Sequence, residues 1–156
     1  MAAFTDFAEN KLIDFLFRGQ ALSINGATAA AGTGPATLYL ALFTAAPTDT
    51  GGGTEVTGGS YARVAIISAL ANWAGTQAAA STVASNGTTG TTSNNAAATF
   101  PAPTAAWGVV TSFGMFDVAA AGNLLIYGNL TASKTVNNGD PAPSFPAASF
   151  SFQIDN

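Results

Sequence analysis

Charged residues are scarce in this chain and unevenly placed. Lys and Arg number four and Asp and Glu eight among 156 residues, so 8% of the chain is charged, against about 25% in ordinary soluble domains. Five of these charges fall in the first eighteen positions. A surface so poor in charge is either kept wet by Thr, Ser, Asn and Gly or covered by other subunits, as in permanent assemblies. We favour the second interpretation.

The amino-acid composition also excludes several classes of function. The chain has no Cys and no His, which excludes disulfides, thiolate zinc sites and histidine-based catalysis. We expect no cofactor, no metal site and no enzymatic activity. Four basic residues against eight acidic ones make nucleic acid an unfavourable partner, and no run of about 18 apolar residues predicts a membrane span. The N-terminus lacks the pattern of a secretion signal, so we expect synthesis in a cytoplasm.

The first elements predicted are a helix over residues 4–18 and a loop over residues 20–35. Thr5 or Asp6 is the expected N-cap, and Gly19 the expected stop. Asp6, Glu9 and Asp14 lie largely off the apolar stripe. The stripe either caps the core of its own domain, which we favour, or docks on a neighbour. Its members are Phe4, Phe7, Ala8, Leu12, Phe15 and Leu16.

The rest of the chain reads as short strands between turns. A strand with two apolar faces begins at Ala36, which predicts a central position. Residues 74–95 are nearly all small and polar, and we expect either an exposed loop or an arm that orders on a neighbouring subunit. The further strands expected are 61–67, 96–100, 109–116, 124–131, 134–136 and 148–154. The pattern predicts one mainly β domain over residues 1–156, an antiparallel β-sandwich or jelly-roll-like barrel with one N-terminal α-helix.

Two kinds of residue are candidates for chemistry. Four acids, namely Asp49, Glu55, Asp117 and Asp140, lie in predicted turns, where carboxylates commonly cap backbone amides rather than catalyse. We expect Arg63 to pair with Glu55 or with Asp49. The tryptophans Trp73 and Trp107 are expected in the core, with an interface anchor or ligand stacking as alternatives.

Several motifs resemble those of a family of small tailed-bacteriophage virion proteins. They include Leu38–Asp49, Gly51–Val56, Gly59–Arg63, Ala98–Pro101, Trp107–Val110, Phe113–Asp117 and Gly122–Gly128. The similarity covers residues 4–18 and 36–140, and segments 20–35, 74–95 and 141–146 fit less well. Members are described as capsid cement (decoration) proteins or as tail-fibre-like proteins.

The resemblance implies a structural role in the virion. We expect a homotrimeric cement protein on the capsid surface that binds and stabilises the major capsid protein lattice. The absence of repeated shaft segments favours cement, and the alternative is a tail-fibre or tail adaptor protein involved in host attachment. The predicted partner contacts are Phe4, Phe7, Leu12, Phe15, Leu16 and Trp107.

Overall fold

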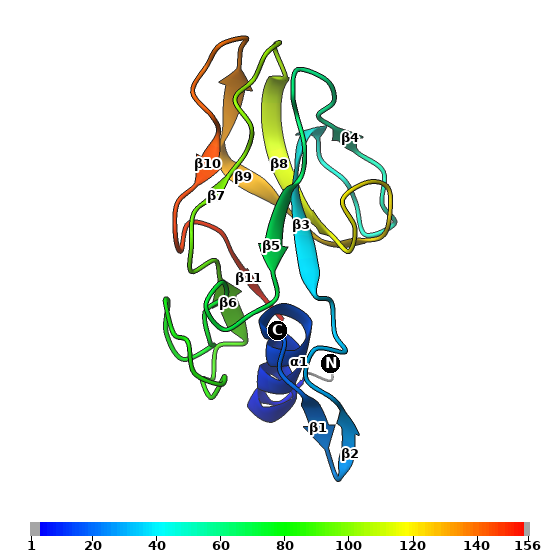
Figure 1. Ribbon diagram of the computed structural model, residues 1–156, viewed down its shortest axis with the longest axis vertical. Coiled ribbons are helices and arrows are strands. Elements are labelled where there is room, and N and C mark those ends of the chain that lie inside the picture. Colours follow the sequence, from blue (N-terminus) through cyan, green and yellow to red (C-terminus); the bar gives the residue numbers. More distant parts are fainter. Residues whose placement is uncertain (1–3, 155–156) are drawn as a thin grey trace. The chain divides into compact units, whose positions relative to one another are not determined.

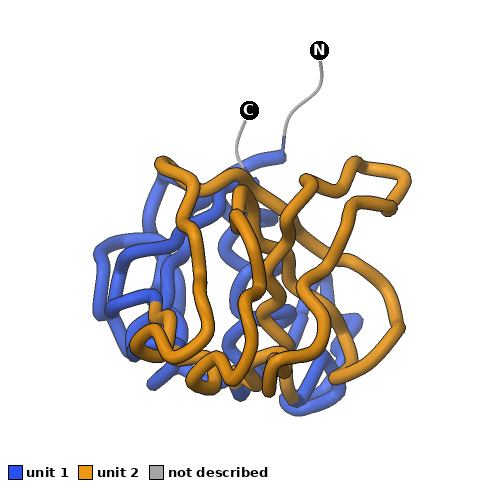
Figure 2. Tube along the Cα trace, turned by 90° about the horizontal axis from the view of Figure 1, so that it is seen from above, with its two compact units in different colours: residues 1–36, 67–98, 145–156 blue, residues 37–66, 99–144 orange. Residues whose placement is uncertain are grey.

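The computed structural model describes residues 4–154, which form two compact units interleaved along the chain. Unit 1 comprises residues 4–36, 67–98 and 145–154, and unit 2 comprises residues 37–66 and 99–144 (Figure 2). The prediction of a single domain over residues 1–156 stays a prediction, and its first three and last two residues lie outside the described part.

Unit 1 begins with the one helix, α1 (Asp6–Arg18), at the position predicted (Figure 1). Of the two N-caps considered, the structure uses Thr5, whose backbone is extended and whose carbonyl accepts the Glu9 N–H at 3.0 Å. Gly19 ends the helix with φ 67°, the left-handed conformation that glycine adopts most readily. Both ends of the helix were therefore predicted by local signals.

The segment 20–35, predicted as a loop, contains a β-hairpin. Strand β1 (Leu22–Ile24) pairs antiparallel with β2 (Ala27–Ala29). Asn25 and Gly26 connect them with φ of 50° and 78°, the two successive left-handed residues of a type I′ hairpin turn. The loop prediction was wrong because the two strands are too short to show an alternating pattern.

Two short strands and a set of aromatic side chains complete unit 1. Strand β6 (Thr91–Ser93) pairs antiparallel with β11 (Ser151–Gln153). Trp73 is fully buried, with ring centroids 5.2 Å from Phe17 and 5.7 Å from Phe150. The expected alternation over 148–154 is confirmed from Phe150 onward, whereas Ala148 is exposed in a left-handed turn conformation.

Unit 2 is built on an antiparallel sheet whose two central strands are long and buried. Its order is β4-β3-β8-β9, and β5 also pairs with β3. The predicted central strand is confirmed, since β3 buries Leu38, Leu40, Ala41, Leu42 and Phe43. The strand bounds are β3 Thr37–Ala45, β4 Thr54–Glu55, β5 Val64–Ile67, β8 Gly108–Phe116 and β9 Leu124–Val136.

Strand β9 is one 13-residue strand where two were predicted. A register shift on β8 between Val110 and Ser112, which face Lys134 and Asn129, absorbs the extra residues of β9. The remaining pair, β7 (Ala98–Thr99) and β10 (Ser144–Phe145), forms a two-stranded sheet.

The mainly β, antiparallel class with one N-terminal helix is confirmed. Between residues 4 and 154 the strands close no barrel, so the jelly-roll-like alternative is not found. The turn predicted around Asn137 is present, because its backbone N–H donates to the Asp140 carboxylate at 2.7 Å. Over the same described range, no helix has the length and apolar character needed to cross a membrane.

Candidate partner-binding surface

The helix packs into unit 1 through charged side chains as well as through Ile13 and Phe17. Glu9 and Asp14, which lie off the apolar stripe, are 1% and 5% exposed. Arg18 is completely buried, and its Nε donates to the Trp73 carbonyl at 3.0 Å. Its Nη2 donates to the carbonyls of Ser81 and Val83 at 3.2 and 2.6 Å. The guanidinium thus satisfies the carbonyl of Trp73 and two carbonyls of residues 74–95, the segment that the sequence left as a loop or an arm.

Asp14 neutralises this arginine and binds the same segment. One carboxylate oxygen lies 2.6 Å from Arg18 Nη1 and also accepts the Ser85 hydroxyl at 2.6 Å, while the other accepts the Ser85 N–H at 2.9 Å. One turn earlier, Asn10 donates to the Gly87 carbonyl and accepts the Thr76 hydroxyl. We call these contacts of Asn10, Asp14 and Arg18 the polar network.

The polar network shows how residues 74–95 are held within unit 1. The segment is irregular up to residue 90 and then forms β6, and residues 78–80, 82–84, 86, 88 and 89 are exposed, as expected for a loop. The helix of its own unit binds the segment at several backbone groups, and its ordering on a neighbouring subunit stays a prediction. A buried ion pair of this kind needs hydrogen bonds to its remaining donors, and the backbone of a segment poor in large side chains supplies them.

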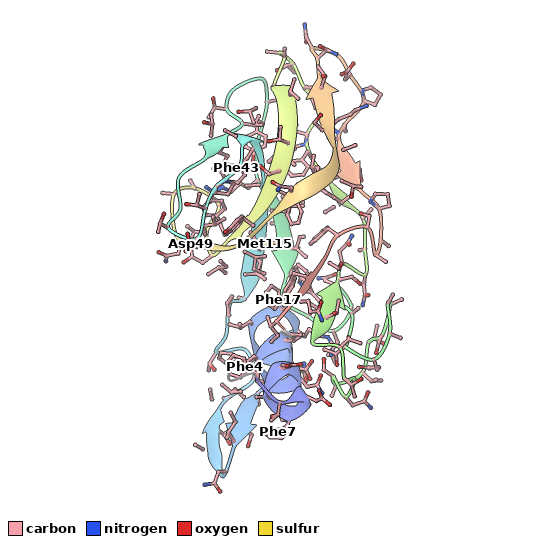
Figure 3. All side chains as sticks on the ribbon, turned by 180° about the vertical axis from the view of Figure 1, so that it is seen from behind. Phe4, Phe7, Phe17, Phe43, Asp49 and Met115 are labelled. Carbon is pink, nitrogen blue, oxygen red and sulfur yellow. The ribbon has the colours of Figure 1, made fainter. Side chains whose placement is uncertain are left out.

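Part of the apolar stripe of the helix consequently faces outward. Phe4, Phe7 and Leu16 are 59%, 56% and 38% exposed, and we call them the exposed helix face. Leu12 and Phe15, the other two helix residues predicted as partner contacts, are half-buried. Figure 3 labels Phe4 and Phe7 and also Phe17, the helix phenylalanine that is 4% exposed. The favoured interpretation, that the whole stripe caps its own core, was therefore wrong for the exposed members.

The remaining predicted partner contact, Trp107, belongs to the other unit. It lies in unit 2 and is 5% exposed, with ring centroids 5.3 Å from Tyr61 and 6.4 Å from Phe100. Its indole N–H donates to the Gly59 carbonyl at 3.0 Å. A tryptophan so packed and hydrogen-bonded belongs to the core of its unit, and Trp73 has the same role in unit 1.

Three of the four turn acids are engaged in structural contacts. Asp117 accepts the backbone N–H and the side-chain amide of Asn123 at 2.8 and 2.7 Å, and these hydrogen bonds lower the pKa of its carboxyl. Asp140 accepts from Asn137 as described above. Over residues 4–154 the structure contains no group of three or more Asp or Glu side chains able to hold a metal ion.

The third engaged acid, Glu55, forms a cluster that the sequence predicted only in part. Its carboxylate accepts two hydrogen bonds from Arg63, at 2.8 and 2.7 Å, which confirms the first of the two expected pairings of this arginine. The Tyr61 hydroxyl donates to the same carboxylate at 3.1 Å, and burial raises the pKa of Tyr61. The Arg63 guanidinium also lies 3.5 Å from the Phe116 ring centroid. The sequence offered no signal for that cation–π contact, which depends on the β3–β8 pairing.

Comparison with known proteins gives a match to a family model. The family model described as "Podophage GP4 fiber I protein gp80" matches residues 3–153. No curated protein matches the chain. The match runs through both units, including segments 20–35 and 74–95, which fit the predicted resemblance less well.

Proposed function

The chain belongs to the family of podophage GP4 fiber I protein gp80, and from this premise we propose that it is a fibre or adaptor component of the phage tail that takes part in host attachment. Its role as a phage virion structural protein follows from the family itself. The tail location is the second of the two roles considered from the sequence, and the family description supports it over capsid cement. The absence of shaft repeats does not oppose it, because one chain can form a single module of a larger fibre.

The exposed helix face is the proposed contact with other copies of this chain. Burying a Phe side chain stabilises association by about 1.5–3 kcal/mol, and Phe4 and Phe7 each leave more than half of their surface exposed. The single observation that carries this proposal is the orientation of the helix: its charged side faces residues 74–95 in the polar network, so the exposed helix face is left in solvent. The predicted trimer remains the proposed oligomer.

We further propose that the role is non-enzymatic. The carboxylates of Glu55, Asp117 and Asp140 are held by hydrogen bonds or an ion pair, as expected for acids that stabilise turns.

The location is tested on purified virions. Cryo-electron microscopy and quantitative mass spectrometry should find this chain on the tail, at far fewer copies than the major capsid protein. A regular distribution over the capsid shell at near-equal copy number would refute the fibre assignment and restore the cement hypothesis.

The contact surface is tested with the double variant F4S/F7S. We expect its self-association, measured by analytical ultracentrifugation, to weaken by about 100-fold or more, from the loss of two buried Phe side chains. Val83→Ser is the matched control, since Val83 is 62% exposed in the same unit but lies off the helix. A wild-type chain that stays monomeric, or a variant that associates normally, would refute the proposed contact.

A further inference from the structure

Unit 2 carries an open groove between two of its turns. The groove has a volume of about 510 Å³, within the range of small-ligand sites. Asp49, labelled in Figure 3, lies on one wall. The lining residues are Thr48, Asp49, Thr50, Gly51, Gly122, Asn123, Leu124, Leu125 and Tyr127. We call it the turn groove.

The first wall is a tight and internally bonded turn. Thr48 and Gly51 exchange both backbone hydrogen bonds, at 3.0 and 2.9 Å. The Thr48 hydroxyl bonds to Gly51 O and lies 3.0 Å from the Thr50 hydroxyl. The turn therefore holds Asp49 at its tip without using the Asp49 carboxylate.

The second wall is held by the cluster around Arg63. Besides pairing with Glu55, Arg63 donates through Nη1 to the carbonyls of Val118 and Ala121, each at 2.9 Å. The Asp117 carboxylate accepts two hydrogen bonds from Asn123 and so closes the same loop. Two walls fixed by their own hydrogen bonds make a preformed groove, which lowers the ordering cost of binding a ligand.

The groove offers an unused carboxylate and an aromatic side chain. Asp49 is exposed and makes no hydrogen bond or ion pair with any other residue in the range 4–154. Tyr127 is 44% exposed, and within that range its hydroxyl is likewise unbonded. No Lys or Arg lines the groove, so an anionic ligand would meet only the negative charge of Asp49.

We propose that the turn groove binds a saccharide unit that is neutral or carries an amino group. Sugar hydroxyls would donate to the Asp49 carboxylate, a charge-assisted hydrogen bond, and the apolar face of the sugar ring would pack on the Tyr127 ring. This inference rests on the proposed fibre function, because a host-attachment protein meets the cell-surface polysaccharide first.

The full-length chain is tested on an array of bacterial cell-surface polysaccharides and their repeating-unit oligosaccharides, spanning neutral, amino and acidic sugars. We expect binding to neutral or amino sugars and exclusion of acidic ones. Asp49→Asn should weaken binding by about tenfold and relax the exclusion of acidic sugars, which a purely structural residue would not do. Tyr127→Ala should weaken binding by about tenfold.

Asp6→Asn is the control, since it removes an exposed carboxylate of unit 1 and should bind like wild type. All variants should keep the wild-type thermal midpoint. Absence of binding to every saccharide, preference for acidic sugars, or normal binding by both groove variants would overturn the inference. A negative result here would not contradict the tail location, because virion imaging tests that location independently.

Discussion

Removing the Asp14 carboxylate should destabilise unit 1 severely. Asp14→Ala deletes an acceptor of three hydrogen bonds, two from Ser85 and one from Arg18. It leaves a fully buried guanidinium without a counter-charge, and breaking a buried pair from one side costs about 3–5 kcal/mol. Domains of this kind are stable by about 5–15 kcal/mol, so the loss is a large fraction of the total.

The assay is urea denaturation at neutral pH, followed by far-UV circular dichroism. With a slope of about 2 kcal/mol per M, the midpoint should fall by roughly 2 M. Hydrogen exchange gives a local readout, since the Ser85 amide donates to Asp14 and should lose protection. Asp6→Ala is the matched control, because this exposed acid in the first turn contributes about 0.3–1 kcal/mol through the helix dipole.

A double-mutant cycle separates the ion pair from packing. Asp14→Ala combined with Arg18→Met removes both charges, so it should cost clearly less than the sum of the two single changes. A loss below about 1 kcal/mol for Asp14→Ala, or equal losses for Asp14→Ala and Asp6→Ala, would refute the reasoning that the polar network orients the helix.

Two further predictions concern unit 2. Burial raises the pKa of Tyr61 above its unfolded value of about 10, so the native state favours the neutral phenol. The stability that this phenol contributes is complete below pH about 10 and is lost as the pH rises further. The free energy of unfolding, measured in urea above pH about 10, should therefore fall more steeply for wild type than for Tyr61→Phe, and parallel curves would contradict this. Gly52 and Gly53 both have φ near 80°, but an added Cβ meets no atom within 4 Å at Gly52, whereas at Gly53 it comes within 2.7–2.9 Å of backbone atoms of Pro47 and Ala45. Gly53→Ala should therefore lower the thermal midpoint more than Gly52→Ala, because the clash costs about 1–3 kcal/mol more. Equal losses would show that the turn relaxes freely.

The elements predicted best are those whose signals lie within a few residues. The strand from Thr37 to Ala45 was evident because both of its faces are apolar, and α1 because Thr5 and Gly19 mark its ends. The hairpin of β1 and β2 was missed since strands of three residues carry too little periodicity. The continuity of β9 was missed because it depends on a register shift in its partner β8.

The candidate surface likewise combines features predicted from local signals with features that depend on distant contacts. The role of Phe4 and Phe7 as partner contacts stays a prediction, whereas the favoured interpretation that their stripe caps its own core was wrong for both, since they are exposed. An apolar stripe normally packs inward, and here the helix instead uses Asp14 and Arg18 to bind residues 81–85, more than 60 positions away. Trp107 was expected in the core or at an interface, and only the packing of Tyr61 and Phe100 around it decides for the core.

The amino-acid sequence alone determined the absence of Cys and His, the antiparallel β class, the position of its helix and the resemblance to phage virion proteins. These follow from composition and from patterns a few residues long. Tertiary structure decided which face of the helix is buried, how residues 74–95 are held and which turns meet to form a groove. Each of these depends on polar side chains finding partners far away in the chain, because a buried charge settles where its hydrogen bonds can be completed.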